Sequence, residues 1–473
     1  MAQAKRGRLP YVNKDYESIR EELMSRIPQL TDRWTDFNAS DLGVVLLELF
    51  AGIADMLAYY IDAQAAECYL PTARQRQNII NLCSLIDYSL HGPVASTTTL
   101  RFTLKESQAD DIVIPAGTLV RAPDANTPVP FVTTAGLTIK AGATEAETNA
   151  VQGEAVTESF TGTGQQMARI TLARTDIAEG TVKVVVASVE WQEVEHFTDS
   201  GAENTHFRVE RDGLDRVSII FGDGKWGTFP RQGATIDVSY LATLGPDGNL
   251  APHRVTEIIS YIYTSGNELV QLTVDNPLPA TGGSERESAD HAKETAPAVL
   301  RSTWKAVTRD DYTALCLAFP GIAKARVMDI NDDPNLRIYT VRICIAPDGG
   351  GLPSPLLKEH LESYLDARRL LTIDAGIVDP AYIPVNVSAL LYTYPGQDIQ
   401  VVKKRALEVL ESQFAFEGQD FGSPVYLSDL VALLDGVEGV SHVVLREPMK
   451  DVTSGFREIP TLGTVTIDTQ VVR

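Results

Sequence analysis

Hydrophobic positions in residues 1–95 repeat at helical spacing and predict a helical region. The longest pattern covers residues 42–69, where apolar side chains recur in alternating steps of four and three. The first apolar line of this predicted helix is Leu42, Leu46, Leu49, Ile53, Met56 and Tyr60. A second line is Phe50, Ala54, Leu57 and Ile61. A helix with two such lines must be covered over most of its circumference, so we expect another chain to complete its bundle across the first line.

The same predicted helix carries an acidic line, Glu48, Asp55 and Asp62, with a spacing of seven residues. We interpret this line as the solvated face of the helix; a salt bridge to another chain is the alternative. Three carboxylates within one apolar stretch also indicate that the stretch does not span a membrane.

Alternation of apolar and polar residues replaces the helical spacing over residues 96–280. This pattern predicts an antiparallel β domain with hairpins, with its first strands near 97–104, 112–120 and 131–139. Residues 141–166 are rich in Ala, Thr, Gly and Glu and are expected to form a loop-like insertion.

The remaining chain mixes helix and strand patterns. It predicts connecting helices over 281–318 and two small, ferredoxin-like α+β subdomains over 319–382 and 383–473. The pattern D-x-x-A-L-x5-G-[IV]-x2-[AV]-x-[VL] starts at Asp311 and again at Asp429, and each copy is expected to form a helix, a stop at glycine and a strand. The fold class predicted for the chain is therefore multidomain α+β.

Composition narrows the classes of function. The chain has 473 residues, 41 Lys and Arg against 63 Asp and Glu, and a net charge of −22, which argues against binding to nucleic acid. The four cysteines form no C-x-x-C pair and are expected to be buried, reduced thiols. The first twenty residues contain no apolar segment of the signal-peptide type.

One glycine motif deserves comparison with a nucleotide site. Gly222, Asp223, Gly224 and Gly227 satisfy G-x-G-x-x-G, which binds dinucleotides only at the start of a helix. Pro230 and a strand pattern follow instead, so we interpret the motif as a structural hairpin turn. The seven histidines are dispersed, and no nucleophile elbow is present. We therefore predict no enzymatic activity, no catalytic residues, and no cofactor or metal site.

Five motifs, taken together and in order, resemble baseplate J-like proteins, which are wedge components of contractile phage tails and related injection machines. The opening one is Asp36-Phe-Asn-Ala-Ser-Asp-Leu-Gly43 with the apolar helix after it. The others are Phe221–Pro230, Gly245-Pro-Asp-Gly-Asn249, Gly282-Gly-Ser-Glu-Arg-Glu287 and Ala306-Val-Thr-Arg-Asp-Asp-Tyr312.

This resemblance implies a structural role. Such wedge subunits build the inner baseplate ring around the tube and spike hub, and they relay the trigger for sheath contraction. The implied partners are other copies of the chain, a second wedge subunit, and the sheath-initiator, tube and hub proteins. The implied location is the tail baseplate of a virion assembled in the host cytoplasm, without membrane insertion.

Two alternatives remain. One is a tail protein that binds or degrades polysaccharide, for which 7% aromatic residues is a poor supply of stacking surfaces. The other is a wedge of a phage-derived injection system within the same family.

Overall fold

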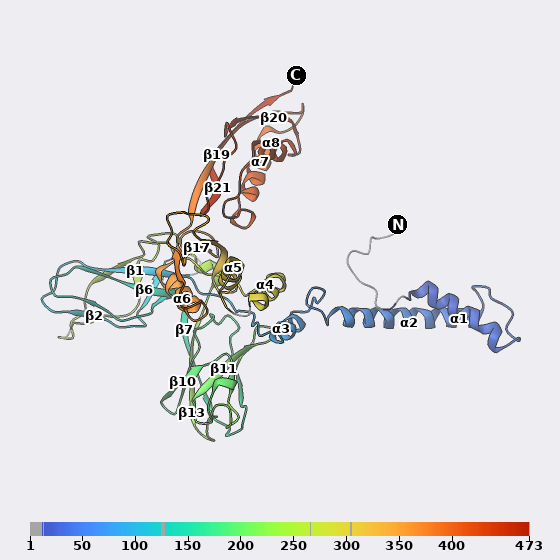
Figure 1. The fold of residues 1–473 in the computed structure, drawn as a ribbon, viewed down its shortest axis with the longest axis horizontal. Coiled ribbons are helices and arrows are strands. Elements are labelled where there is room, and N and C mark those ends of the chain that lie inside the picture. The colour runs from blue at the N-terminus through green and yellow to red at the C-terminus, as the bar shows by residue number, and fades with distance from the viewer. Residues whose placement is uncertain (1–11, 13, 124–127, 265, 303–304, 473) are drawn as a thin grey trace. The chain divides into compact units, whose positions relative to one another are not determined.

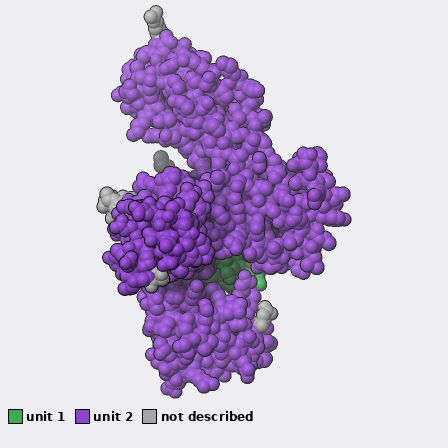
Figure 2. All heavy atoms as spheres, turned by 90° about the vertical axis from the view of Figure 1, so that its left-hand side faces the viewer, with its two compact units in different colours: residues 1–90, 212–214, 288–296 green, residues 91–211, 215–287, 297–473 purple. Residues whose placement is uncertain are grey.

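The structure, a computed structural model, describes residues 12, 14–123, 128–264, 266–302 and 305–472. The chain divides into two compact units, coloured separately in Figure 2. Unit 1 comprises residues 1–90, 212–214 and 288–296, and unit 2 comprises the rest. The molecule is mixed α+β, with helices first and a β-rich middle region, as the sequence predicts.

Unit 1 contains the helices α1 (Tyr16–Leu30), α2 (Leu42–Ala66) and α3 (Arg76–Ser84). A capping box at Asp15 and Ser18 begins α1, and the carboxylate of Asp41 accepts hydrogen bonds from the first backbone N–H groups of α2. Pro28 lies inside the last turn of α1 and does not end the helix.

The middle region of unit 2 forms two large sheets and one small one (Figure 1). Its strands are β1 (Thr97–Leu104), β2 (Ile112–Ile114), β3 (Leu119–Ala122), β4 (Val129–Thr133), β5 (Leu137–Ile139), β6 (Glu145–Gln152), β7 (Glu154–Thr161), β8 (Arg169–Thr171), β9 (Lys183–Val186), β10 (Val189–Glu193), β11 (His206–Arg211), β12 (Val217–Phe221), β13 (Thr235–Ala242), β14 (Glu257–Ile258) and β15 (Leu272–Asp275).

The six-stranded sheet has the order β14-β3-β4-β6-β1-β15, and the seven-stranded sheet has the order β7-β13-β9-β10-β11-β12-β8. The pairing is antiparallel except between β10 and β11. Each sheet has its own apolar core, the first around Phe102 and Phe131 and the second around Trp191 and Phe221. The alternation along the sequence therefore encodes two cores where we expected one β domain.

The predicted loop at residues 141–166 is wrong for most of its length. Residues 145–152 form β6, which pairs with β1 and β4 of the six-stranded sheet. Residues 154–161 form β7, which pairs with β13 of the seven-stranded sheet. The chain therefore passes from one sheet to the other at Gly153. The sequence pattern did not indicate these strands, because they are rich in small and acidic residues. β7 is largely exposed and therefore carries little apolar periodicity.

The C-terminal part contains the helices α4 (Ala289–Ser302), α5 (Arg309–Leu317), α6 (Pro355–Asp366), α7 (Ile399–Gln413) and α8 (Leu427–Asp435), with the strands β16 (Ile322–Met328), β17 (Thr340–Pro347), β18 (Asp374–Val378), β19 (Ala381–Thr393), β20 (Val440–Glu447) and β21 (Glu458–Val471). The strands form two three-stranded sheets, β16-β17-β18 and β20-β19-β21.

The two C-terminal sheets share one pairing pattern but differ in the order of their elements. In each, the central strand pairs antiparallel with one edge strand and parallel with the other. The first sheet is built in the order α5-β16-β17-α6-β18 and the second in the order β19-α7-α8-β20-β21. In the described residues neither follows the β-α-β-β-α-β order of ferredoxin-like domains, so that part of the predicted fold class is not confirmed.

The sequence repeat marks the same local structure twice. Gly321 follows α5 and precedes β16, while Gly439 follows α8 and precedes β20. Both glycines have positive φ, 87° and 99°, and each lies in the turn between helix and strand, three residues after the helix cap at Ala318 or Gly436. Asp311 and Asp429 each occupy the third position of their helix, where a negative charge is favourable. The helix and the strand expected for each copy are confirmed, whereas the expected stop of each helix at the glycine is wrong.

Candidate functional site

The first apolar line of α2 is exposed. The six side chains singled out from the sequence have exposed fractions between 48% at Leu46 and 74% at Leu42. Phe50, Leu57 and Ile61 of the second line are also more than half exposed. At 100° per residue the two lines together cover an arc of about 160°. We call this arc the apolar face of α2.

The opposite side of α2 packs against α1 within unit 1. Its covered apolar residues are small, Val44, Ala51 and Ala58, and they are spaced by seven. The acidic line lies beside them. Glu48 accepts a hydrogen bond from Arg20 of α1 at 3.0 Å, and Asp62 accepts one from the backbone N–H of Val12 at 2.7 Å.

The interpretation of the acidic line as a solvated face is therefore wrong. Small residues let α1 approach closely, and the carboxylates at the rim of the contact find donors there. This arrangement leaves the large side chains of α2 outward, which is the reverse of an ordinary amphipathic helix.

Among the described residues, α2 is the single helix long and apolar enough to cross a membrane, judged by length and composition alone. Length and composition do not separate a membrane helix from one covered by protein. The three carboxylates weigh against the membrane, since each would cost roughly 2.5–3.5 kcal/mol at the centre of a bilayer.

A second site lies in unit 2, where two of the glycine motifs meet. The side chain of Asn249 donates to the carbonyl of Gly283 at 2.8 Å and accepts from its N–H at 2.9 Å. A Cβ atom on Gly283 would lie 2.4 Å from the carbonyl oxygen of Gly245. These contacts join the loop after β13 to the segment that pairs with the start of β1. We call this contact region, with Ser96, Gln152 and Thr243, the glycine junction.

Gln152 connects the two large sheets within the glycine junction. It is fully buried at the end of β6. Its Oε1 accepts from the hydroxyl of Thr243 at 2.7 Å and from the N–H of Leu244 at 3.0 Å, both just after β13. Its own N–H donates to the carbonyl of Ser96 at 2.8 Å, and the Ser96 hydroxyl donates to the carbonyl of Gly248 at 2.6 Å.

Glu287, the last residue of the motif that begins at Gly282, binds His91, the residue at which unit 2 begins. Its carboxylate accepts from the N–H of His91 at 3.3 Å, and its own N–H donates to the His91 carbonyl at 3.1 Å. It does not close a capping box with Ser284, because α4 begins only at Ala289.

Residues next to the first C-terminal sheet also contact the segments of the glycine junction. The Thr281 hydroxyl donates to the carbonyl of Leu352 at 2.9 Å, and the hydroxyls of Thr97 and Ser354 are hydrogen bonded. A Cβ atom on Gly321 would lie 3.1 Å from the carbonyl oxygen of Gly282. Segments that lie up to 257 residues apart in the sequence thus contact one another.

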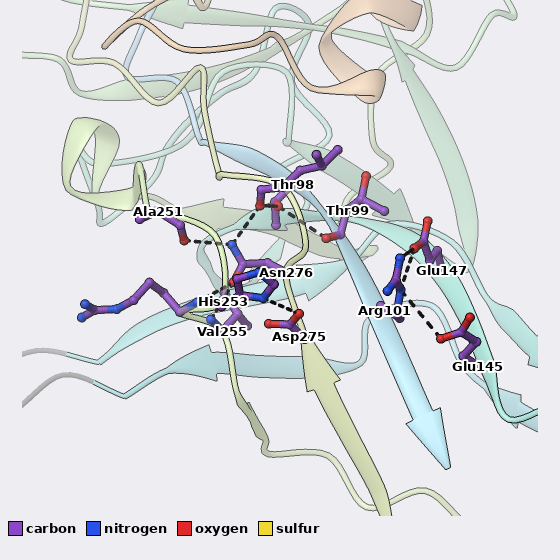
Figure 3. Close-up of polar contacts among 12 residues, drawn as sticks. Thr98, Thr99, Arg101, Glu145, Glu147, Ala251, His253, Val255, Asp275 and Asn276 are labelled. Atoms are coloured by element: carbon purple, nitrogen blue, oxygen red, sulfur yellow. Dashed lines mark hydrogen bonds and ion pairs between the residues drawn. The ribbon is translucent and has the colours of Figure 1, made fainter. Parts of the chain in front are cut away.

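A third site, shown in Figure 3, joins the segment before β14 to the turn after β15. Asn276 is fully buried and makes four hydrogen bonds. Its Oδ1 accepts from the N–H groups of Arg254 and Val255 at 2.7 and 2.8 Å, and its Nδ2 donates to the carbonyls of Ala251 and Leu278 at 3.1 and 2.9 Å. Sequence reasoning missed Asn276, because a lone asparagine after a strand resembles any turn residue.

The G-x-G-x-x-G segment is a tight loop between β12 and β13. Asp223 Oδ1 accepts from the N–H groups of Lys225 and Trp226, and these bonds hold the pKa of the carboxyl below its ordinary value. The N–H of Gly224 donates to the carbonyl of Gly227 at 2.9 Å. β12 pairs with β11 and β8, and β13 with β7 and β9, so the segment is not the hairpin turn we expected.

Gly224→Val is expected to lower the free energy of unfolding by about 1–3 kcal/mol, because Gly224 has a φ of 86° that a β-branched residue tolerates poorly. Urea denaturation followed by tryptophan fluorescence measures the change. Gly136→Val is the control, since its backbone is not left-handed and its nearest neighbour would be 3.7 Å away. Equal stability of the two variants would refute the strain argument.

The described residues were predicted to offer no metal site and no reactive thiol pair, and their geometry bears on both points. In the part of the chain that the structure describes, no group of three or more His, Cys, Asp or Glu side chains could hold a metal ion. Burial raises the pKa of Cys316 and Cys344 to about 12, so these thiols stay neutral and unreactive at ordinary pH. Cys68 is exposed, contrary to the prediction that all four cysteines are buried.

Two family models match this chain. Residues 15–85 match the N-terminal domain of bacteriophage baseplate proteins, and residues 385–468 match the C-terminal domain of baseplate J-like proteins. The first match contains α1, α2 and α3, and the second contains most of the sheet β20-β19-β21. No curated protein matches the sequence.

Solved baseplate structures are similar at low identity. One is the cryo-EM structure of the anti-feeding prophage baseplate, with 15% identity, 95% of this chain and 90% of that chain covered, and a TM-score of 0.34. Another is the TssK-TssF-TssG baseplate subcomplex of the type VI secretion system, with 10% identity, 71% and 96% covered, and a TM-score of 0.30.

The resemblance carried by the sequence motifs is confirmed by the two family matches. The chain thus contains a bacteriophage baseplate domain at its N-terminal helices and a baseplate J-like domain at its C-terminal sheet.

Proposed function

We propose that this baseplate protein is a wedge subunit without enzymatic activity, which helps to build the inner ring around the tube and spike hub. In this role it pairs with other copies of itself and with a second wedge subunit, and it contacts the sheath-initiator, tube and hub proteins. It relays the trigger for sheath contraction from the tail baseplate of a virion or of a related injection system.

The apolar face of α2 carries the proposal. Nine large or medium apolar side chains on one helix face water in the single chain, namely Leu42, Leu46, Leu49, Phe50, Ile53, Met56, Leu57, Tyr60 and Ile61. Exposed apolar surface of this extent marks an interaction site in a soluble protein. The steps of four and three favour helices of a bundle as the partners, because such a line fits knobs into holes.

The width of the apolar face of α2 indicates how many partner helices are needed to cover it. A single coiled-coil seam uses one line of alternating steps, and α2 offers two such lines side by side. Two further helices, from a second copy and from the second wedge subunit, would cover both lines. Light scattering of the chain alone and mixed with that subunit tests the proposal, and a chain that is monomeric in both samples contradicts it.

The chain is expected not to insert into membranes. After incubation with vesicles of phosphatidylcholine and phosphatidylglycerol, it should be released by an alkaline carbonate wash. The reason is that insertion of α2 would bury Glu48, Asp55 and Asp62 without water. A wash-resistant fraction that is lost in a variant lacking residues 42–66 would instead assign α2 to a lipid partner.

A further inference from the structure

The two large sheets of unit 2 are connected in three ways at one place. The chain itself passes from β6 to β7 through Gly153. The side chain of Gln152, on β6, binds the backbone and side chain of residues that follow β13. Asn249 binds both polar backbone groups of Gly283. We propose that the glycine junction is a rigid joint, which makes the six-stranded and seven-stranded sheets move as one body.

Glycines at a joint are compatible with a hinge as well as with a rigid contact, and the space around Gly248 and Gly283 favours the rigid contact. Gly248 and Gly283 do not have positive φ, so their backbone conformation is open to other residues. They lack room for a side chain instead. A Cβ on Gly248 would lie 2.9 Å from both Ser96 Oγ and Gln152 Cγ, and one on Gly283 would lie 2.4 Å from the Gly245 carbonyl oxygen. Glycine is required here for close contact between segments.

Burial and hydrogen bonding also favour a rigid joint. Ser96, Gln152 and Thr243 are buried, and the two hydroxyls and Gln152 Oε1 pair with one another and with the backbone, whereas Gln152 Nε2 is buried without a hydrogen-bond partner. Opening the joint would expose these pairs one by one or leave them unpaired away from water, and a buried network of this kind resists such partial opening. The network is built from neutral side chains, so its strength is expected to change little with salt or pH.

A rigid joint has a consequence for the relay of a trigger, which rests on the proposed function. A displacement applied to one sheet would reach the other sheet with little loss, because the joint does not absorb it by bending. A flexible joint would uncouple the two sheets.

Distance measurements between the sheets test the joint. Spin labels are placed at Val113→Cys on β2, which packs in the core of the six-stranded sheet, and at Val189→Cys on β10, in a Cys68→Ser background; both valines are exposed. Pulsed electron resonance on the full chain should give one narrow distance distribution. Asn249→Ala, which removes both bonds to Gly283, and Gly283→Ala, which inserts a Cβ into the contact, should each broaden it at least twofold.

Gly136→Ala is the matched control and should keep the narrow distribution, because its Cβ would meet nothing closer than 3.7 Å. A broad distribution in the otherwise unmodified chain would overturn the proposal, whether or not the variants fold. So would narrow, unchanged distributions in both variants. The measurement uses the chain without partners, so a failure of the joint and a failure of wedge assembly are seen separately.

Discussion

Replacing Leu46, Leu49 and Ile53 together by glutamine is expected to abolish assembly of the chain with the proposed wedge partners. Fully burying such a side chain contributes about 1.5–3 kcal/mol, and 48–60% of each is exposed in the single chain, so losing all three weakens binding by about 2–5 kcal/mol, or roughly 50-fold to 3,000-fold. All three are at least 48% exposed in the single chain, so its own fold should tolerate the change. Light scattering and co-purification with the second wedge subunit measure the effect.

The matched control replaces three exposed apolar residues of unit 2, Ile338, Leu371 and Met449, by glutamine. This control should assemble as the unmodified chain does, because its substitutions lie outside α2. Circular dichroism should show that both triple variants keep their helix and strand content. Full assembly of the α2 variant would refute the role given to the apolar face.

The second large effect is expected inside unit 2. Asn276→Leu keeps approximate size but removes four hydrogen bonds, and it leaves the buried N–H of Val255 and the partly buried N–H of Arg254 without this acceptor. Unsatisfied buried groups cost about 1–3 kcal/mol each, so we expect a loss of about 3–5 kcal/mol in the free energy of unfolding. Urea denaturation of the full chain measures it.

Two further variants make this measurement specific. Asn276→Asp keeps the acceptor for both N–H groups but cannot donate to Ala251 and Leu278, so its loss should be intermediate at a pH where the carboxylate is charged. Thr273→Val, on the exposed side of β15, should change stability by less than about 0.5 kcal/mol. A loss for Asn276→Leu no larger than that of Thr273→Val would contradict the role assigned to Asn276.

Elements with strong periodicity were predictable from the chain alone. The steps of four and three gave α2, and alternation gave β1, because in both cases one face of the element differs from the other in polarity. The repeat beginning at Asp311 and Asp429 predicted two helix, glycine and strand units for the same reason. Glycine after an apolar helix is a local signal that needs no tertiary contact.

Where the local signal is weak, the prediction was wrong. β6 and β7 contain Glu, Thr and Ala at exposed positions, so their strand character comes from pairing with β1, β4 and β13 and not from their own apolar pattern. The connectivity of the two C-terminal sheets could not be predicted either, since the apolar pattern of a strand does not determine which strand will pair with it. The position of the acidic line was predicted wrongly because Arg20 of α1 and the backbone N–H of Val12, which precedes α1, supply donors that no pattern within α2 indicates.

The sequence by itself determined the type of each periodic element, the excess of apolar surface on α2 and the motifs that resemble baseplate J-like proteins. Only the tertiary structure decided which face of α2 is covered, that the chain crosses between two sheets at Gly153, and that the glycine motifs meet at Asn249 and Gly283. The physical reason is the distance along the sequence over which each feature arises. Periodicity arises from backbone geometry within a few residues, whereas close contacts between glycines and single buried amides depend on segments brought together by folding.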